Sequence, residues 1–569
     1  MATVDGGELV VRMLEREGVK QVYALMGGHI DTILQACVDH GIKIYDTRHE
    51  QAAGHMADAY ARLTGRPGVV VVTAGPGVTD VVTAVANAHL DAVPMVVIGG
   101  RHPLAEDEMM PLQELHGVAL MQSITKWVRL VRDVKRIPEY MAMAFREATT
   151  GRPGPVFLEL PVDVLTADVD DATVSFPKAY RPQQAPAPSP EAVEMALALL
   201  AQAQRPLIMG GRGVWLAGAA AELRQFAELT QIPVIANAMT RGALPEDEHP
   251  LSFGSFVTAG TTFLQAAGGP DVVLLLGGRF GLFTGGPNSF VPQQATIIQV
   301  DIAGEEIGRF REVKLGIVAD CREALRAFIA AAKGRTFEAR REWLDALTRG
   351  QAAFKSGFQQ IAMSASEECI HPFRLAYEVN RYMGGKGIII GDGGETAIWM
   401  ELAVTPKRAG SYLFHGYLGC LGTGIPFGLA AKAAFPDERV VVVTGDGSVG
   451  LNFAEFDTAV RHNLPIVVVI SNDQAWGMCK HEQVVRYGEQ RIVATELGPT
   501  HYEKAAEGFG VHAEFVTRAA DIVPTLDRAF ASGRPACVNV MTDPAVISPM
   551  VLATTSPAAR QRPVPQGSR

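Results

Sequence analysis

Cysteine, positive charge and long apolar runs are all scarce in this 569-residue chain. Its six cysteines are far apart and form no Cys-x-x-Cys pair, which argues against a disulfide framework or a cysteine-rich zinc site and is typical of reduced thiols. The net charge of −10 argues against nucleic acid as a main partner. No apolar run approaches the roughly 20 residues that span a bilayer, and the early acids Asp5 and Glu8 are not typical of a signal peptide. We therefore expect a cytoplasmic protein that binds neither nucleic acid nor membranes.

What is present is the composition of a well-buried globular enzyme, with 48% hydrophobic and 20% charged residues. The length allows three or four domains. In the first block, residues 1–180, apolar strands at 22–25, 42–46, 69–72 and 95–98 alternate with helical stretches. Such alternation predicts βαβ units and a parallel sheet. The proline-rich residues 180–190 then predict a linker.

Two further blocks repeat this alternation, residues 191–345 and residues 365–545. The predicted fold class is therefore α/β, with three successive parallel-sheet domains. A tail, residues 546–569, holds several prolines and three arginines and no acid. The interpretation that we slightly favour is a disordered terminus, and the functional alternatives are a mobile lid over the site or a strap for an anionic substrate.

Glycine-rich turns follow two expected strands of the second block, at residues 210–213 and 277–279. A tight turn between a strand and a helix explains each of them, and that is the interpretation we favour. The functional alternative is a nucleotide site for ADP or CoA, for which a lone glycine-rich turn is weak support.

The motif with the most chemical content is a pair of strand ends. Gly445-Asp446-Gly447-Ser448 follows one β-branched run, and Ser471-Asn472-Asp473 follows another. Such runs predict buried parallel strands, and open α/β sheets bind ligands at the carboxyl ends of their strands. Glycines let the backbone approach a diphosphate, and Asp446 offers a hard oxygen ligand for Mg²⁺. The pair resembles the signature of thiamine-diphosphate (ThDP) enzymes, except that Asp473 stands where that signature has an asparagine.

A second motif lies in the first block, where Glu50 begins an expected helix. An acid at that place can be an ordinary helix cap. However, residues 73–77 of the same block resemble the loop with which ThDP enzymes contact the pyrimidine ring. Over essentially its whole length the chain resembles the pyruvate-oxidase and acetolactate-synthase branch of ThDP enzymes, and within it benzaldehyde lyase and 2-hydroxyacyl-CoA lyase. The stretches that carry the likeness are GGELVVR, HIDTI, DTRHE, GHMADAYAR, VTAGPG, ITKW, HGYLG and TGDGSVG.

This resemblance implies a role for each matching residue. The three blocks would be pyrimidine-binding, middle and diphosphate-binding domains, in a homodimer or homotetramer with active sites between subunits. Glu50 would share a proton with the cofactor ring, and Leu421 would bend the cofactor. The catalytic residues would be Glu50, His29, Gln113, His415 and Glu482, although either histidine alone could be purely structural. The metal ligands would be Asp446, Asp473 and the carbonyl of Ala475. The cofactor-binding residues would be Thr73, Gly75, Gly394, Thr396, Ala397, Gly419, Leu421, Gly445, Asp446, Gly447, Ser448, Asp473, Ala475, Trp476, Gly477 and Met478.

Three departures from benzaldehyde lyase bear on the substrate. Asp473 adds an anionic ligand next to the diphosphate. Ala397 and Glu482 replace aromatic residues, so the pocket should be more polar, and Glu482 could handle protons. The arginine-bearing tail suits a phosphate-bearing substrate such as an acyl-CoA.

The predicted function is that of a ThDP- and Mg²⁺-dependent carbon–carbon lyase that also runs as a carboligase on 2-hydroxy carbonyl or acyl-CoA substrates. The alternative is carboligation of pyruvate, as in acetolactate synthases, against which residues 251–262 do not resemble the flavin-binding stretch of those enzymes. A more distant alternative is an inactive, ThDP-binding paralogue.

Overall fold

The computed structural model describes residues 3–260, 263–281, 284, 289–364 and 366–555. It contains three α/β bodies, each built on a six-stranded parallel sheet. The α/β fold class predicted from the sequence is therefore confirmed. Among the described residues no helix is both long and apolar enough to cross a bilayer. Of the predicted tail, residues 556–569 lie outside the described part of the chain, and residues before them form a short helix, α24 (Pro549–Thr555).

The N-terminal sheet has the strand order β3-β2-β4-β5-β7-β6. Its central strands are apolar runs buried on both faces, as a parallel sheet covered by helices requires. Its strands are β2 (Gln21–Leu25), β3 (Lys43–Asp46), β4 (Gly68–Val72), β5 (Met95–Arg101), β6 (Trp127–Leu130) and β7 (Pro155–Pro161). Its helices are α1 (Gly6–Arg16), α2 (Asp31–Asp39), α3 (Glu50–Thr64), α4 (Pro76–Asp80), α5 (Val82–Leu90), α6 (Gly117–Met121), α7 (Ile137–Thr149) and α8 (Val162–Leu165). A small antiparallel pair joins β1 (Thr3–Val4) to β8 (Val169–Asp170).

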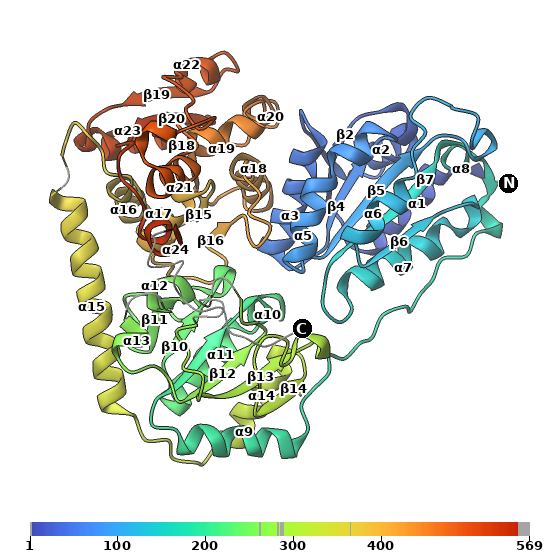
Figure 1. Cartoon of the computed structure of the whole chain (residues 1–569). Coiled ribbons are helices and arrows are strands. Elements are labelled where there is room, and N and C mark those ends of the chain that lie inside the picture. Colours follow the sequence, from blue (N-terminus) through green and yellow to red (C-terminus); the bar gives the residue numbers. More distant parts are fainter. Residues whose placement is uncertain (1–2, 261–262, 282–283, 285–288, 365, 556–569) are drawn as a thin grey trace.

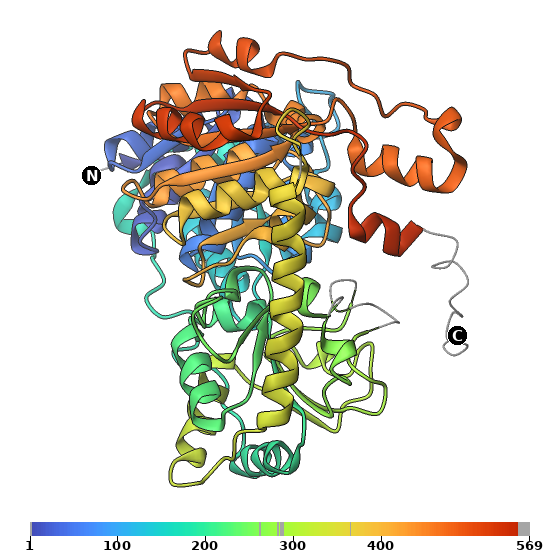
Figure 2. The ribbon, with the colours of Figure 1, turned by 90° about the vertical axis from the view of Figure 1, so that its left-hand side faces the viewer.

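The middle sheet has the order β11-β10-β9-β12-β13-β14, which is the 3-2-1-4-5-6 order of a dinucleotide-binding fold. Its strands are β9 (Pro206–Gly210), β10 (Val234–Ala236), β11 (Ser252–Ser255), β12 (Val272–Leu276), β13 (Thr296–Asp301) and β14 (Leu315–Val318). Its helices are α9 (Pro190–Gln202), α10 (Arg212–Leu216), α11 (Ala220–Thr230), α12 (Phe256–Gly260), α13 (Phe263–Ala266) and α14 (Cys321–Ala332). The long helix α15 (Arg341–Ser364) then runs along one side of the molecule from this domain to the third (Figures 1 and 2).

The C-terminal sheet has the order β16-β15-β17-β18-β20-β19. Counted along its own domain, this is 2-1-3-4-6-5, the same order as in the N-terminal sheet. Its strands are β15 (Ile388–Gly391), β16 (Tyr412–Phe414), β17 (Val440–Gly445), β18 (Val467–Asn472), β19 (His512–Val516) and β20 (Ala536–Met541). Its helices before α24 are α16 (Pro372–Met383), α17 (Glu395–Ala403), α18 (Gly424–Ala434), α19 (Asp446–Val449), α20 (Glu455–Arg461), α21 (Gly477–Tyr487), α22 (Tyr502–Glu507) and α23 (Ile522–Ala531).

The N- and C-terminal domains meet through α3 and α18, which pack against each other. The ring of His55 on α3 lies edge-on to Phe427 on α18, with ring centroids 6.1 Å apart. In each domain the packed helix is the first long helix after the second strand of that domain. The two cofactor-domain candidates therefore face each other through equivalent elements.

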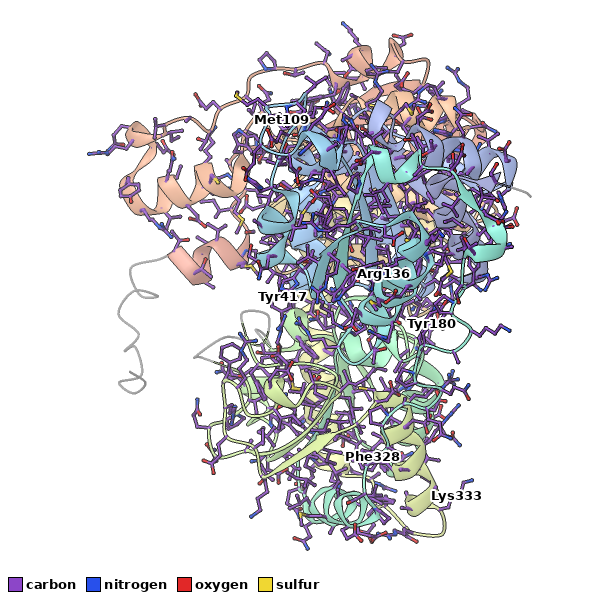
Figure 3. All side chains as sticks on the ribbon, turned by 90° about the vertical axis from the view of Figure 1, so that its right-hand side faces the viewer. Met109, Arg136, Tyr180, Phe328, Lys333 and Tyr417 are labelled. Carbon is purple, nitrogen blue, oxygen red and sulfur yellow. The ribbon has the colours of Figure 1, made fainter. Side chains whose placement is uncertain are left out.

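A single buried carboxylate, Asp91 at the end of α5, joins all three domains. Its Oδ2 accepts a hydrogen bond of 2.7 Å from Arg62 of its own domain and lies 3.1 Å from Nη2 of Arg212 in the middle domain. Its Oδ1 accepts from the backbone N–H of Tyr417 in the C-terminal domain. Tyr417 is labelled in Figure 3 at this junction. Gly416 is required beside it, because a Cβ at that position would overlap the Asp91 carboxylate.

Candidate active site

The C-terminal sheet places a cavity where its strand order reverses, between β15 and β17. Open α/β sheets leave a crevice at this point, because the loops after the two strands leave in opposite directions. The cavity has a volume of about 390 Å³. Every residue from Gly394 to Met478 that the sequence predicts to bind the cofactor lines it, and so does His415. Two residues of the middle domain, Asn237 and Val257, complete its wall.

Two carboxylates meet in the lining of this cavity. Asp446 follows β17 and is buried, and Asp473 follows β18 and is partly buried. Burial, and then the neighbouring charge of Asp473, raise the pKa of Asp446 to about 8. Burial raises the pKa of Asp473 as well. The Oδ2 atom of Asp446 has no hydrogen-bond partner among the described residues.

Such a pair fits a divalent cation. Buried like charges are unfavourable without a counterion, and carboxylate and carbonyl oxygens are the ligands that Mg²⁺ prefers. The loop is also shaped for this, because Asp473 Oδ1 accepts a 3.2 Å hydrogen bond from the N–H of Ala475. The predicted ligands Asp446, Asp473 and Ala475 therefore lie together, and a cation there would neutralise the pair.

A carboxylate that the sequence prediction missed holds the diphosphate loop in place. Asp392 follows β15 and is almost fully buried. It accepts hydrogen bonds from Ser448 Oγ (2.7 Å) and Thr444 Oγ1 (3.0 Å). Ser448 Oγ in turn accepts from the N–H of Gly422, next to the wedge residue Leu421. The only signal in the sequence was its place after the apolar run 388–391, directly before a pair of glycines.

The N-terminal domain gathers a second group of predicted residues at its own switch point, between β2 and β4. His29 follows β2 and Thr73 follows β4, and His29 Nδ1 lies 3.4 Å from Thr73 Oγ1. Gln113 packs on Gly75, where a Cβ would lie 2.8 Å from the Cβ of Gln113. Glu50 is buried, 3.5 Å from the Cβ position of Gly77. The five residues predicted for this domain therefore form one cluster.

The protonation of the two histidines follows from their surroundings. Burial, and to a smaller extent the charge of His102, lower the pKa of His29, so it is neutral at pH 7. His415 Nδ1 lies 3.0 Å from the carbonyl oxygen of Gly416. Because a carbonyl can only accept, that nitrogen carries the hydrogen. The nitrogen of His415 that this carbonyl does not engage is therefore Nε2.

The two groups do not meet within one chain. Within the part of the chain that the structure describes, the N-terminal domain contributes no residue to the lining of the cavity of the C-terminal domain. Glu482 is also outside the lining; it lies on α21, 3.4 Å from the guanidinium of Arg486. Among the catalytic candidates, only His415 lies at the cavity.

The glycine-rich turns of the middle domain cross each other at that sheet's switch point, beside a cavity of about 220 Å³. A Cβ at Gly211 would overlap the carbonyl oxygen of Gly277, so close backbone packing explains these glycines. The arginines of the turns point to another domain. Arg212 donates to the carbonyl of Asp91 (2.7 Å), and Arg279 donates to that of Leu90 (2.9 Å).

Comparison with known proteins identifies the class. Three family descriptions match the chain in order: "Thiamine pyrophosphate enzyme, N-terminal TPP binding domain" over residues 4–120, the central domain over 193–328 and the C-terminal TPP binding domain over 392–540. The fold is thus that of a thiamine pyrophosphate enzyme, thiamine pyrophosphate being another name for ThDP.

The relatives extend over the whole chain. The acetolactate synthase large subunit IlvG of Mycobacterium tuberculosis is 34% identical over 555 residues, which are 96% of this chain and 97% of that protein. The acetolactate synthase isozyme 1 large subunit of Escherichia coli is 32% identical, over 95% of this chain and 94% of that protein. The 2-hydroxyacyl-CoA lyase 2 of Bos taurus is 32% identical, over 95% and 90%. The chain belongs to the thiamine pyrophosphate enzymes of the pyruvate-oxidase and acetolactate-synthase superfamily.

These comparisons confirm the predicted superfamily and its ThDP cofactor. They leave the predicted aldehyde-lyase type without specific support, because acetolactate synthases predominate among the relatives. They give no support to ADP or CoA in the middle domain.

Proposed function

We propose that this protein is a ThDP- and Mg²⁺-dependent enzyme that makes or breaks the bond between two carbonyl-derived carbons. Its first candidate reaction is carboligation of pyruvate, as the names of the acetolactate synthase relatives suggest. The observation that carries the proposal is the cavity at the β15–β17 switch point, whose lining includes the whole predicted diphosphate and metal set. Bound ThDP supplies a nucleophilic carbon and an electron sink there.

The residues of this chain would hold the cofactor and move protons. Asp446, Asp473 and the Ala475 carbonyl would hold Mg²⁺ and, through it, the diphosphate. The buried Glu50 would hold a proton at the pyrimidine ring. His415, which lines the cavity and whose Nδ1 is hydrogen-bonded to the Gly416 carbonyl, would take or return a proton at the reacting oxygen through Nε2.

A second candidate reaction is cleavage of a 2-hydroxy ketone or a 2-hydroxyacyl thioester to an aldehyde or ketone. It is favoured by the cluster of His29, Thr73 and Gln113. Such cleavage requires removal of the hydroxyl proton, and a neutral histidine with a hydrogen-bonding neighbour suits that step. The 2-hydroxyacyl-CoA lyase relative is consistent with this reaction.

One assay separates the two candidates. Purified protein with ThDP and Mg²⁺ is given pyruvate, benzoin or a 2-hydroxyacyl-CoA, and acetolactate, benzaldehyde and released aldehyde are each measured. Acetolactate from pyruvate supports the first candidate, and aldehyde release without pyruvate turnover supports the second. Glu50→Gln should abolish either activity. ThDP binding without turnover of any of the three would overturn both and favour the inactive paralogue.

We also propose that each active site forms between two subunits, with the Glu50 cluster of one facing the Asp446 cavity of the other. The separation of the two clusters within one chain supports this, and so does the exposed apolar loop that precedes Gln113, residues 109–112. Mixing two inactive variants, Glu50→Gln and Asp446→Ala, tests it after subunit exchange. Statistical pairing of a symmetric dimer would restore about a quarter of wild-type activity, because half of the dimers carry one intact site. If both clusters of each active site came from the same subunit, mixing the two variants would restore no activity.

A further inference from the structure

His481 on α21 hydrogen-bonds through both of its ring nitrogens. Nε2 lies 2.9 Å from the carbonyl oxygen of Pro544, and Nδ1 lies 2.5 Å from Oε2 of Glu395. A carbonyl has no hydrogen to donate, so Nε2 carries one. The remaining short contact holds a proton between the imidazole and the carboxylate. His481 and Glu395 therefore form a charge-assisted pair, which is shielded from solvent.

The other oxygen of Glu395 reaches the same stretch of chain. Oε1 accepts a 2.8 Å hydrogen bond from the N–H of Ser548, whose side chain is fully buried. The pair thus hydrogen-bonds to the backbone at two points four residues apart, the carbonyl of Pro544 and the N–H of Ser548. These points lie directly before α24, which packs against α21 (Figure 1).

These hydrogen bonds lie next to the cofactor cavity. Glu395, at the start of α17, and Met550 of α24 both line the cavity. The first residue of α21, Gly477, lies between the metal end and the pair, because a Cβ there would meet both Asp473 and Glu395. Val551 on α24 is completely buried, so the segment is packed in place and does not hang free.

We propose that Glu395 and His481 are a positioning pair that fastens residues 544–555 as one wall of the ThDP cavity and thereby slows release of the cofactor. Neither residue needs to touch the reacting atoms. The pair acts through Pro544 and Ser548, which set where Met550 lies. Loosening the pair should open the cavity and leave the Mg²⁺ ligands in place.

The test compares three variants of the full chain by hydrogen exchange and by the rate of ThDP release. Glu395→Leu removes the hydrogen bonds to Ser548 and to His481 at similar volume, so that His481 keeps only its contact with Pro544. Glu395→Gln keeps an acceptor for Ser548 and an amide that can donate to His481, so it is the conservative rescue. Glu496→Gln is the matched control. Glu496 is an exposed acid that pairs with Lys480, and Lys480 lies on α21, as His481 does.

We expect Glu395→Leu to speed amide exchange in residues 550–555 and ThDP release by about ten-fold or more. Glu395→Gln and Glu496→Gln should stay within about three-fold of the wild type. Unchanged exchange in α24 for Glu395→Leu, or equal acceleration by Glu496→Gln, would overturn the proposal. His481→Phe, which keeps the ring and removes both hydrogen bonds, provides the same test if Glu395→Leu does not fold. Because exchange needs no substrate, its outcome is independent of which reaction the enzyme catalyses.

Discussion

Replacing Asp91 with asparagine should weaken the junction of the three domains more than any single contact there suggests. Asp91 is 3% exposed and is the carboxylate partner of Arg212, while Arg62 also pairs with Asp58 at 2.6 Å. The asparagine would keep the shape of the side chain and remove its charge. Arg62 would stay compensated, whereas Arg212 would keep only a backbone carbonyl.

The magnitude follows from this asymmetry. Removing one partner of a buried ion pair costs about 3–5 kcal/mol, and the retained Asp58 places the expected loss near the lower end, at about 3 kcal/mol. For a cooperative unit the size of one of these domains, that loss corresponds to a fall in Tm of roughly 6–12 °C. Calorimetry is the suitable assay, because a chain with three domains need not unfold in one step and each transition can be followed separately.

The pH dependence has a definite sign. Burial alone would raise the pKa of Asp91, but the charges of Arg212 and Arg62 outweigh it and lower the pKa below its ordinary value. The stabilisation is therefore complete above the ordinary aspartate pKa of about 3.9 and is lost as the pH falls through the lower, folded-state pKa. Asp39→Asn, at an exposed helix end, is the control. A Tm for Asp91→Asn within about 1 °C of that control would refute the reasoning.

Four other substitutions test separate features. Gly416→Ala should lower the Tm of the same junction, because Gly416 has φ +101° and a Cβ would overlap the Asp91 carboxylate. Gly357→Ala should have the opposite sign and stabilise by about 0.5–1 kcal/mol in thermal unfolding, because that glycine is exposed within helix α15 and has open space around it. Arg241→Met should destabilise by about 3 kcal/mol or more in urea unfolding, because it removes the ion-pair partner of the buried Glu246 and the partly buried Glu401, which the arginine pairs at 2.8 and 3.1 Å. Asp473→Asn should raise the Tm of metal-free protein above about pH 8, where Asp446 also loses its proton and the two carboxylates repel each other. It should weaken Mg²⁺ binding by about ten-fold in calorimetric titration; tighter Mg²⁺ binding would contradict the assigned ligand role.

The sequence predicts the three sheets and the cofactor loops because both leave local patterns. Buried parallel strands appear as runs such as 440–443, and their carboxyl ends are the places where ligand groups occur. Asp446 and Asp473 could therefore be placed together across 27 positions. The two aspartates are neighbours in the structure because β17 and β18, which precede them, are adjacent parallel strands.

Pairings between side chains or loops far apart in the sequence have no such local sign. His481 meets Glu395 across 86 positions, and Asp91 meets Tyr417 across 326. Nothing near these residues in the sequence distinguishes them from solvent-exposed acids and histidines. Glu482 shows the converse. The comparison with benzaldehyde lyase suggested that it handles protons, whereas its carboxylate lies 3.4 Å from the guanidinium of Arg486, one turn along α21, and outside the cavity lining.

The shared 2-1-3-4-6-5 strand order and the contact of α3 with α18 have a consequence for the history of the fold. A surface that packs against its own topological equivalent is self-complementary, as in a two-fold symmetric dimer. The chain therefore carries an approximate internal dyad. This is the arrangement expected if one ancestral domain first paired with a copy of itself, and duplication then freed one copy to keep the glutamate and the other to keep the metal loop.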